Sequence, residues 1–108
     1  MPITLNDENF DKEIKEAGRP ILVDFWAIWC NPCVVLGSIL EKLEKEYEDK
    51  LILGKINIDE SPIIAQRYGI DRIPTVVFFK EGKPVSGFLG LKAEGEVKEI
   101  INNMLNGN

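Results

Sequence analysis

Hydrophobic residues form short continuous runs in parts of this chain, and each run predicts a strand. Residues 20–27 (PILVDFWA) and 50–59 (KLILGKINID) are almost continuously apolar, which is typical of strands buried on both faces of a sheet. Residues 74–80 (PTVVFFK) and 84–90 (PVSGFLG) flank the turn residues 81–83 (EGK). This arrangement predicts a hairpin of two further strands.

The stretches between these runs have the spacing of amphipathic helices. The strongest helix is predicted over residues 31–48, where one face collects Leu36, Ile39, Leu40, Leu43 and Tyr47. Further helices are predicted over 6–18, 61–69 and 92–106, each with plausible residues at its start or end.

The order of these elements predicts an α/β protein with one domain over residues 1–108. The first strand–helix–strand unit should pair its strands in parallel, whereas the hairpin is antiparallel. We therefore expect a central mixed sheet of four to five strands, flanked on both faces by four helices. The length of 108 residues fits a single core.

Composition and charge narrow the possible functions. The hydrophobic fraction of 44% and the charged fraction of 29% are those of a globular protein. The net charge is −5 and no cluster of Lys and Arg occurs, which disfavours nucleic acid or an anionic membrane as a partner. No apolar run is long enough to span a membrane, and the acidic start lacks a signal-peptide pattern. We expect a cytoplasmic monomer, in a compartment that disfavours permanent disulfides.

The chain has two cysteines, Cys30 and Cys33, and no histidine. A structural zinc site needs four Cys or His ligands, so no metal site is expected within one chain. A disulfide across two intervening residues closes a very short loop and would add little stability. The local pattern favours the interpretation that Cys30 and Cys33 are a redox-active pair.

The predicted elements place Cys30 between the end of a buried strand and the start of the longest helix. Unpaired N–H groups and the helix dipole at such a position favour a thiolate. Cys33 lies one turn further in and should face the protein more. Cys30 should therefore attack a disulfide, and Cys33 should resolve the mixed disulfide. Pro32 suits the first turn, where its missing N–H is not needed.

Asp24 is a carboxyl inside the apolar run ILVDFW, and two interpretations remain open. It is either an acid at the end of a strand, bonded to nearby backbone, or a buried group whose pKa is raised by desolvation. A buried carboxyl of this kind could accept the proton of Cys33 as a general base. Lys55, on the next buried strand, either extends to solvent or lies near that acid.

The segment VDFWAIWCNPC closely resembles the active-site segment of the thioredoxin family. The resemblance continues along nearly the whole chain, in order, through KINID, YGI, IPT, FFKEGK and a glycine at position 90. It implies the thioredoxin fold and a thiol–disulfide oxidoreductase that reduces protein disulfides, with roles in electron transport and cell redox homeostasis. It also implies no bound cofactor beyond a reversible Cys30–Cys33 disulfide, and an electron donor of the thioredoxin-reductase type.

The same resemblance implies roles for individual residues. Cys30 would be the nucleophile, Cys33 the resolving cysteine, Asp24 the general base and Lys55 its neighbouring lysine. Pro74 would be a cis proline that faces the cysteines, and the backbone of Ile73 would pair with an extended substrate. The substrate-docking surface would consist of Trp29, Asn31, Pro32, Ile73, Pro74 and Gly90.

The chain departs from the family pattern around the cysteines. Asn31 stands where the family usually has glycine, and Val34 where it commonly has lysine. Other departures are Ile28, Val35, Ser38 and Arg72. No cation lies between the cysteines, which favours a reductant. A dedicated or more oxidising enzyme of this fold, or a non-catalytic binding module, are the alternatives.

Overall fold

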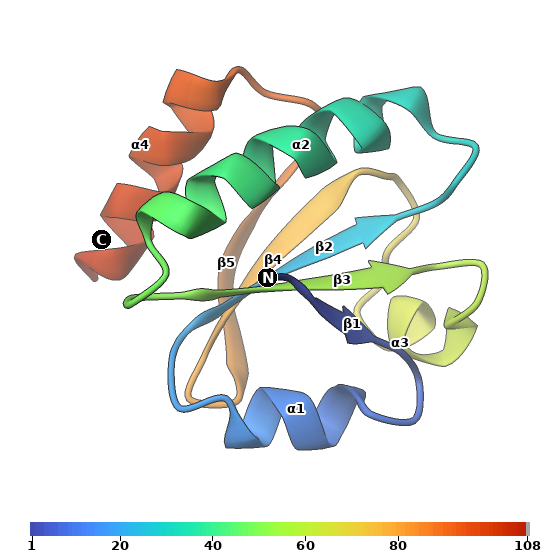
Figure 1. Cartoon of the computed structure of the whole chain (residues 1–108). Helices are drawn as coiled ribbons and strands as arrows, with labels where there is room; N and C mark the ends of the chain where they lie inside the picture. Colours follow the sequence, from blue (N-terminus) through green and yellow to red (C-terminus); the bar gives the residue numbers. More distant parts are fainter. Residues whose placement is uncertain (108) are drawn as a thin grey trace.

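The computed structural model describes residues 1–107. They form one mixed five-stranded sheet that is covered by helices on both faces (Figure 1). The strand order is β1-β3-β2-β4-β5. The strands are β1 (Ile3–Leu5), β2 (Ile21–Trp26), β3 (Ile52–Asn57), β4 (Thr75–Lys80) and β5 (Lys83–Leu89). Strand β3 pairs in parallel with both β1 and β2, whereas β4 pairs antiparallel with β2 and β5. The predicted fold class is confirmed.

Four helices connect and cover these strands: α1 (Phe10–Glu16), α2 (Asn31–Glu46), α3 (Pro62–Arg67) and α4 (Glu94–Leu105). Each predicted helix is present, shorter by a few residues at its ends. The hydrophobic pattern alone missed β1, because this strand has three residues and only Leu5 is fully buried. The last residue of the predicted domain, position 108, lies outside the described residues.

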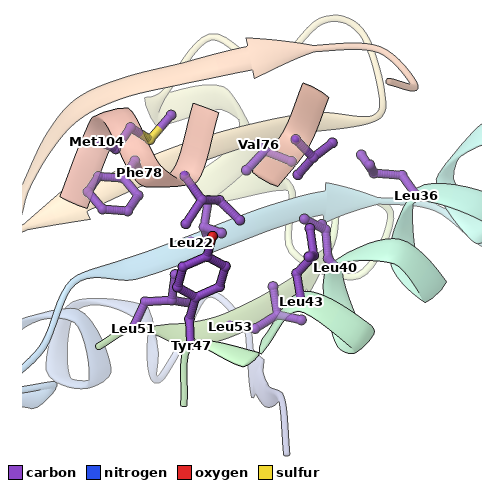
Figure 2. Close-up of a cluster of buried hydrophobic side chains, with 12 residues drawn as sticks. Leu22, Leu36, Leu40, Leu43, Tyr47, Leu51, Leu53, Val76, Phe78 and Met104 are labelled. Atoms are coloured by element: carbon purple, nitrogen blue, oxygen red, sulfur yellow. The ribbon is translucent and has the colours of Figure 1, made fainter. Parts of the chain in front are cut away.

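Two hydrophobic cores lie on opposite faces of the sheet. On one face, α2 packs through Leu36, Leu40 and Leu43 against Leu22 and Phe78 of the sheet (Figure 2). Helix α4 completes this core with Val97 and Ile101. On the other face, α1 and α3 cover a second core that contains Phe10, Ile64 and Phe79. Figure 1 shows these two helical layers above and below the sheet.

Strand β2 is the central element of this arrangement. It pairs with β3 on one side and β4 on the other, and residues 21–25 are all buried. Its carboxyl end leads through residues 27–30 directly into α2. The sequence segment with both cysteines is therefore held at the carboxyl end of the central strand, where β2 leads into α2. No helix among residues 1–107 combines the length and the hydrophobicity needed to cross a membrane.

Gly87 on β5 provides a test of the sheet packing. A Cβ built at Gly87 would overlap the backbone carbonyl oxygen of Val76 on β4, whereas a Cβ at Gly95 in α4 meets no atom within 4 Å. We expect Gly87→Ala to lower the free energy of unfolding by about 1–3 kcal/mol, because β5 must move away from β4. Gly95→Ala should raise it by up to about 1 kcal/mol. Denaturant unfolding of both variants measures the difference, and equal effects would contradict the packing described.

Candidate active site: a disulfide at the start of helix α2

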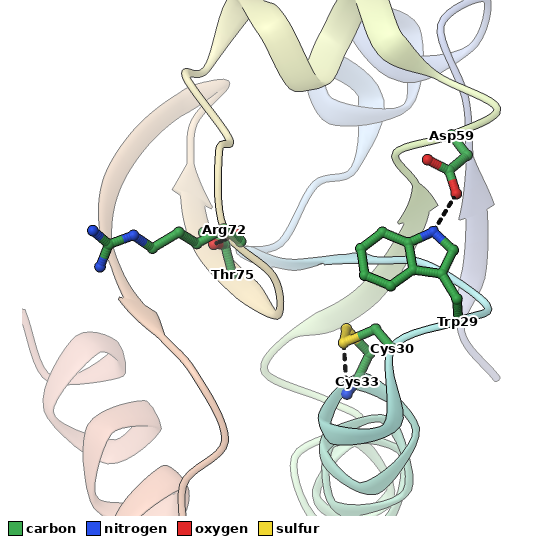
Figure 3. Close-up of a disulfide and its surroundings, with 6 residues drawn as sticks. All are labelled: Trp29, Cys30, Cys33, Asp59, Arg72 and Thr75. Carbon is green, nitrogen blue, oxygen red and sulfur yellow. Dashed lines mark hydrogen bonds between the residues drawn. A yellow bond between two sulfur atoms is a disulfide. The ribbon is translucent and has the colours of Figure 1, made fainter.

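Cys30 and Cys33 form a disulfide at the amino end of α2, with their Cα atoms 5.2 Å apart. Cys30 is the N-cap residue of the helix, and its backbone is extended. The backbone N–H of Cys33 donates to Cys30 Sγ over 3.2 Å, as the dashed line in Figure 3 shows. The Cys30 sulfur therefore occupies the place where an N-cap side chain normally accepts a helix N–H, a position that favours negative charge.

Exposure does not separate the two cysteines as strongly as the sequence suggested. Cys30 is 5% exposed and Cys33 is 3% exposed, so both are buried when they form the disulfide. They pack with Ala27, and the partly buried side chains of Trp26, Ile58 and Ile73 cover this small cluster. Their difference lies in position, because Cys30 caps the helix and Cys33 lies inside its first turn.

The Ile73–Pro74 segment lies across from the helix start. Its peptide bond is cis, as the resemblance implied. Pro74 is buried, and its carbonyl oxygen accepts the N–H of Gly90 over 2.8 Å. Thr75 Oγ1 donates to the carbonyl oxygen of Arg72 over 2.5 Å, which fixes the other end of the segment. The structure thus brings Cys30, Ile73, Pro74 and Gly90 to one end of the sheet.

Asp24 lies on β2, on the sheet face that α2 covers. Its residue is 0% exposed, and neither carboxylate oxygen has a hydrogen-bond partner among the described residues. The interpretation as an acid bonded to backbone is therefore wrong. Burial raises the pKa of Asp24 from 3.8 to about 6, Lys55 opposes this rise, and Glu41 adds to it. Asp24 can therefore bind and release a proton near neutral pH.

Lys55 is the counter-charge of this buried acid. It lies beside Asp24 in the parallel register of β2 and β3, so both side chains are on the same sheet face. Its side chain is 26% exposed, and Nζ lies 3.1 Å from Glu41 Oε2 and 5.6 Å from the centre of the Trp26 ring. The ammonium is therefore held between the sheet and α2, rather than extended freely into solvent.

Comparison with known proteins agrees with this geometry. The thioredoxin family model matches residues 1–103. The chain belongs to the thioredoxin family. Among its relatives, thioredoxin of Chlorobaculum thiosulfatiphilum is 49% identical over 96 residues, which cover 89% of each chain. Thioredoxin of Rickettsia bellii is 43% identical over 103 residues, or 95% of this chain and 98% of the relative.

A third relative, the chloroplastic M-type thioredoxin of Chlamydomonas reinhardtii, is 39% identical over 102 residues, covering 94% of this chain and 73% of its own. Family membership together with the paired cysteines identifies the chain as a thiol–disulfide oxidoreductase of the protein-disulfide-reductase type. The redox group is the Cys30–Cys33 disulfide. Within residues 1–107, no group of three or more His, Cys, Asp or Glu residues could hold a metal ion.

The surface beside the disulfide is apolar, as the departures from the family pattern indicated. Trp29 is 65% exposed, and Ile28, Val34 and Val35 are exposed as well. In Figure 3, the exposed Arg72 side chain extends away from the disulfide. Arg72 therefore contributes its backbone carbonyl to the site and directs its charge elsewhere.

The sequence did not indicate three residues that hold side chains of this site in place. Asp59 accepts a hydrogen bond from Trp29 Nε1 over 2.8 Å and so orients the exposed ring (Figure 3). Trp26 and Glu41 contact the Lys55 ammonium. Glu41 could have been found, because it lies eight residues after Cys33 and thus on the same side of α2. Nothing in the sequence signals the contact of Asp59 with Trp29.

The buried carboxyl of Asp24 should make stability depend on pH. Its pKa is raised on folding, so the unfolded chain ionises first, and the folded protein loses stability as pH rises from 3.8 through about 6. The full loss above this window is on the order of 3 kcal/mol. We expect Asp24→Asn to be more stable than the wild type by roughly 1–3 kcal/mol at pH 8, and about equally stable at pH 4.

Denaturant unfolding of the oxidised proteins between pH 4 and pH 8 measures this difference. Asp71→Asn is a matched control, because Asp71 is an exposed aspartate near the same end of the sheet. Removing this exposed carboxylate should change the free energy of unfolding by less than about 0.5 kcal/mol. A constant difference between Asp24→Asn and the wild type across this range would show that Asp24 does not ionise as described.

Proposed function

We propose that the protein reduces disulfides in other proteins, with Cys30 as the nucleophile and Cys33 as the resolving cysteine. The observation that carries this proposal is the position of the Cys30 sulfur at the N-cap of α2, where it accepts the Cys33 N–H. The same hydrogen bond and the dipole of a 16-residue helix stabilise a thiolate when the pair is reduced. Cys33 has no equivalent position, since it lies inside the first turn.

The reaction consists of two exchanges. The Cys30 thiolate attacks one sulfur of a substrate disulfide, forms a Cys30–substrate disulfide and releases the first substrate thiolate. Cys33 then transfers its proton to Asp24 and attacks Cys30 Sγ. This step forms the Cys30–Cys33 disulfide and releases the second substrate thiolate. Two electrons have moved from the dithiol to the substrate, and the proton on Asp24 is lost to solvent.

An extended substrate segment would be bound beside the cysteines by backbone pairing. Strand β4 begins only at Thr75, and Ile73 forms none of the backbone hydrogen bonds in the turns and loops of the described chain. Its N–H and C=O can therefore pair with a substrate strand. Trp29, Asn31, Pro32, Pro74 and Gly90 would surround that segment. All but Pro74 have some exposed surface.

Turnover requires a separate electron donor, and we propose one of the thioredoxin-reductase type. Family membership supports this partner, since the protein itself holds only one exchangeable disulfide. A reductive direction fits a reducing compartment such as the cytoplasm. Both cores are completed within one chain, which is consistent with action as a monomer.

A more oxidising enzyme of the same fold is the second candidate, and the reduction potential decides between the two. Asn31 and Pro32 place no cation between the cysteines, so the thiolate receives no extra charge stabilisation. We expect a potential below about −220 mV, at or below that of the glutathione pool. Equilibration of the Cys30–Cys33 pair with glutathione buffers measures it. A potential in the range of about −120 to −180 mV would show an oxidant instead.

The roles of the two cysteines can be tested by trapping. We expect Cys33→Ser to form a stable mixed disulfide with a disulfide-bonded protein substrate, because the first exchange occurs and the second cannot. The matched variant Cys30→Ser should form roughly tenfold less of it, since Cys33 lies inside the first turn and lacks the N-cap position that stabilises a thiolate. Non-reducing electrophoresis and intact-mass measurement detect the adduct. Equal trapping by both variants would overturn the assignment.

A further inference from the structure

Gly37 lies in the middle of α2, one turn after Cys33 and one turn before Glu41. Residues four apart fall on the same side of a helix, so these three residues form a stripe that ends at the partner of Lys55. Gly37 is buried, and its φ is not positive. The backbone therefore does not require glycine here, although glycine destabilises the middle of a helix relative to alanine.

The space beside Gly37 is occupied by the Lys55 ammonium. A Cβ built on Gly37 would lie 3.2 Å from Lys55 Nζ, closer than an ordinary van der Waals contact, and would meet no other atom within 4 Å beyond the adjacent backbone of α2. The missing side chain of Gly37 thus leaves a niche on α2 that the Lys55 ammonium occupies. The other contacts of that group are Glu41 on α2 and the Trp26 ring on β2.

We propose that Gly37 is a positioning residue, whose missing side chain lets the Lys55 ammonium lie against α2 on the sheet face that carries Asp24. Because the inference assigns Asp24 a part in resolution, it rests on the function proposed above. A side chain at position 37 pushes the ammonium outward, toward Glu41 and solvent. The positive charge then acts less strongly on Asp24, since Coulomb attraction falls with distance and with exposure to water.

The direction of the effect follows from the charged groups that act on Asp24. These groups are Lys55 from β3, which lowers the pKa of Asp24, and Glu41 from α2, which raises it. When Lys55 is displaced, its charge lowers the pKa of Asp24 less, so this pKa should rise above about 6. A general base with a higher pKa is less ionised at neutral pH and accepts the Cys33 proton less often.

Gly37→Ala is the test, because it adds one methyl group and favours the helix. We expect this variant to have a higher Asp24 pKa, and to be more resistant to denaturant than the wild type at pH 4, where Asp24 is protonated in both folded proteins. Resolution of the mixed disulfide should be up to about twofold slower at pH 7 and unchanged at pH 9, where Asp24 is ionised in both proteins. Carbon-13 NMR of the Asp24 carboxyl in the oxidised protein gives the pKa without interference from titrating thiols.

Three controls make the result specific. Gly95→Ala, in open space on α4, should stabilise the protein and leave the Asp24 pKa unchanged. Lys55→Met should raise that pKa further than Gly37→Ala does. In the double variant, Gly37→Ala should add nothing to the effect of Lys55→Met, because the charge it displaces is gone. Gly37→Ser adds a Cβ at the same place and serves as a second variant.

The inference is overturned if Gly37→Ala leaves the Asp24 pKa at its wild-type value while Lys55→Met raises it. It is also overturned if Gly37→Ala shifts the pKa equally in the presence and absence of Lys55. Failure of the proposed function gives a different result. In that case Asp24→Asn resolves mixed disulfides as fast as the wild type at pH 6 to 9. The carboxyl titration of Gly37→Ala still shows a raised Asp24 pKa, because that effect depends only on the position of Lys55.

Discussion

The burial of β2 on both faces and both edges is the constraint on which the active site depends. This strand pairs with β3 and β4 and contributes to the cores on both sides of the sheet. Its position cannot shift by one residue without exchanging the residues of the two cores. The same rigidity fixes where the strand ends, and so fixes Cys30 at the start of α2 and Asp24 beneath it. The reactive geometry is thus a consequence of core packing.

Much of this structure could be predicted from the sequence, because the main elements have strong local patterns. The apolar run of β2 and the spacing of leucines in α2 identify the strand and helix that carry the cysteines. Family resemblance supplied the cis bond before Pro74, which no local pattern indicates. Strand β1 could not be predicted, since a three-residue strand at the sheet edge forms only because β3 offers it a partner.

The parts of the site that sequence reasoning missed are contacts between residues distant in the chain. The bond between Trp29 and Asp59 spans 30 residues, and the ion pair of Lys55 with Glu41 joins a strand to a helix. Such contacts depend on the relative placement of elements rather than on local pattern. The burial of Cys30 is of this kind too, because Ile58 and Ile73, which cover the pair, come from other loops. The position of Cys30 at the helix start therefore does not by itself predict that it is as buried as Cys33.

The charges beneath the disulfide show how the site differs from a core packed only for stability. An apolar residue in place of Asp24 would avoid two unpartnered carboxylate oxygens in a buried position. A direct ion pair would satisfy the carboxyl and hold its pKa low. The environment of Asp24 is intermediate between an apolar core and a direct ion pair. The Lys55 ammonium binds Glu41 and lowers the pKa of Asp24 without a hydrogen bond to it. A carboxyl that is buried but only partly compensated is the arrangement that can exchange a proton near neutral pH.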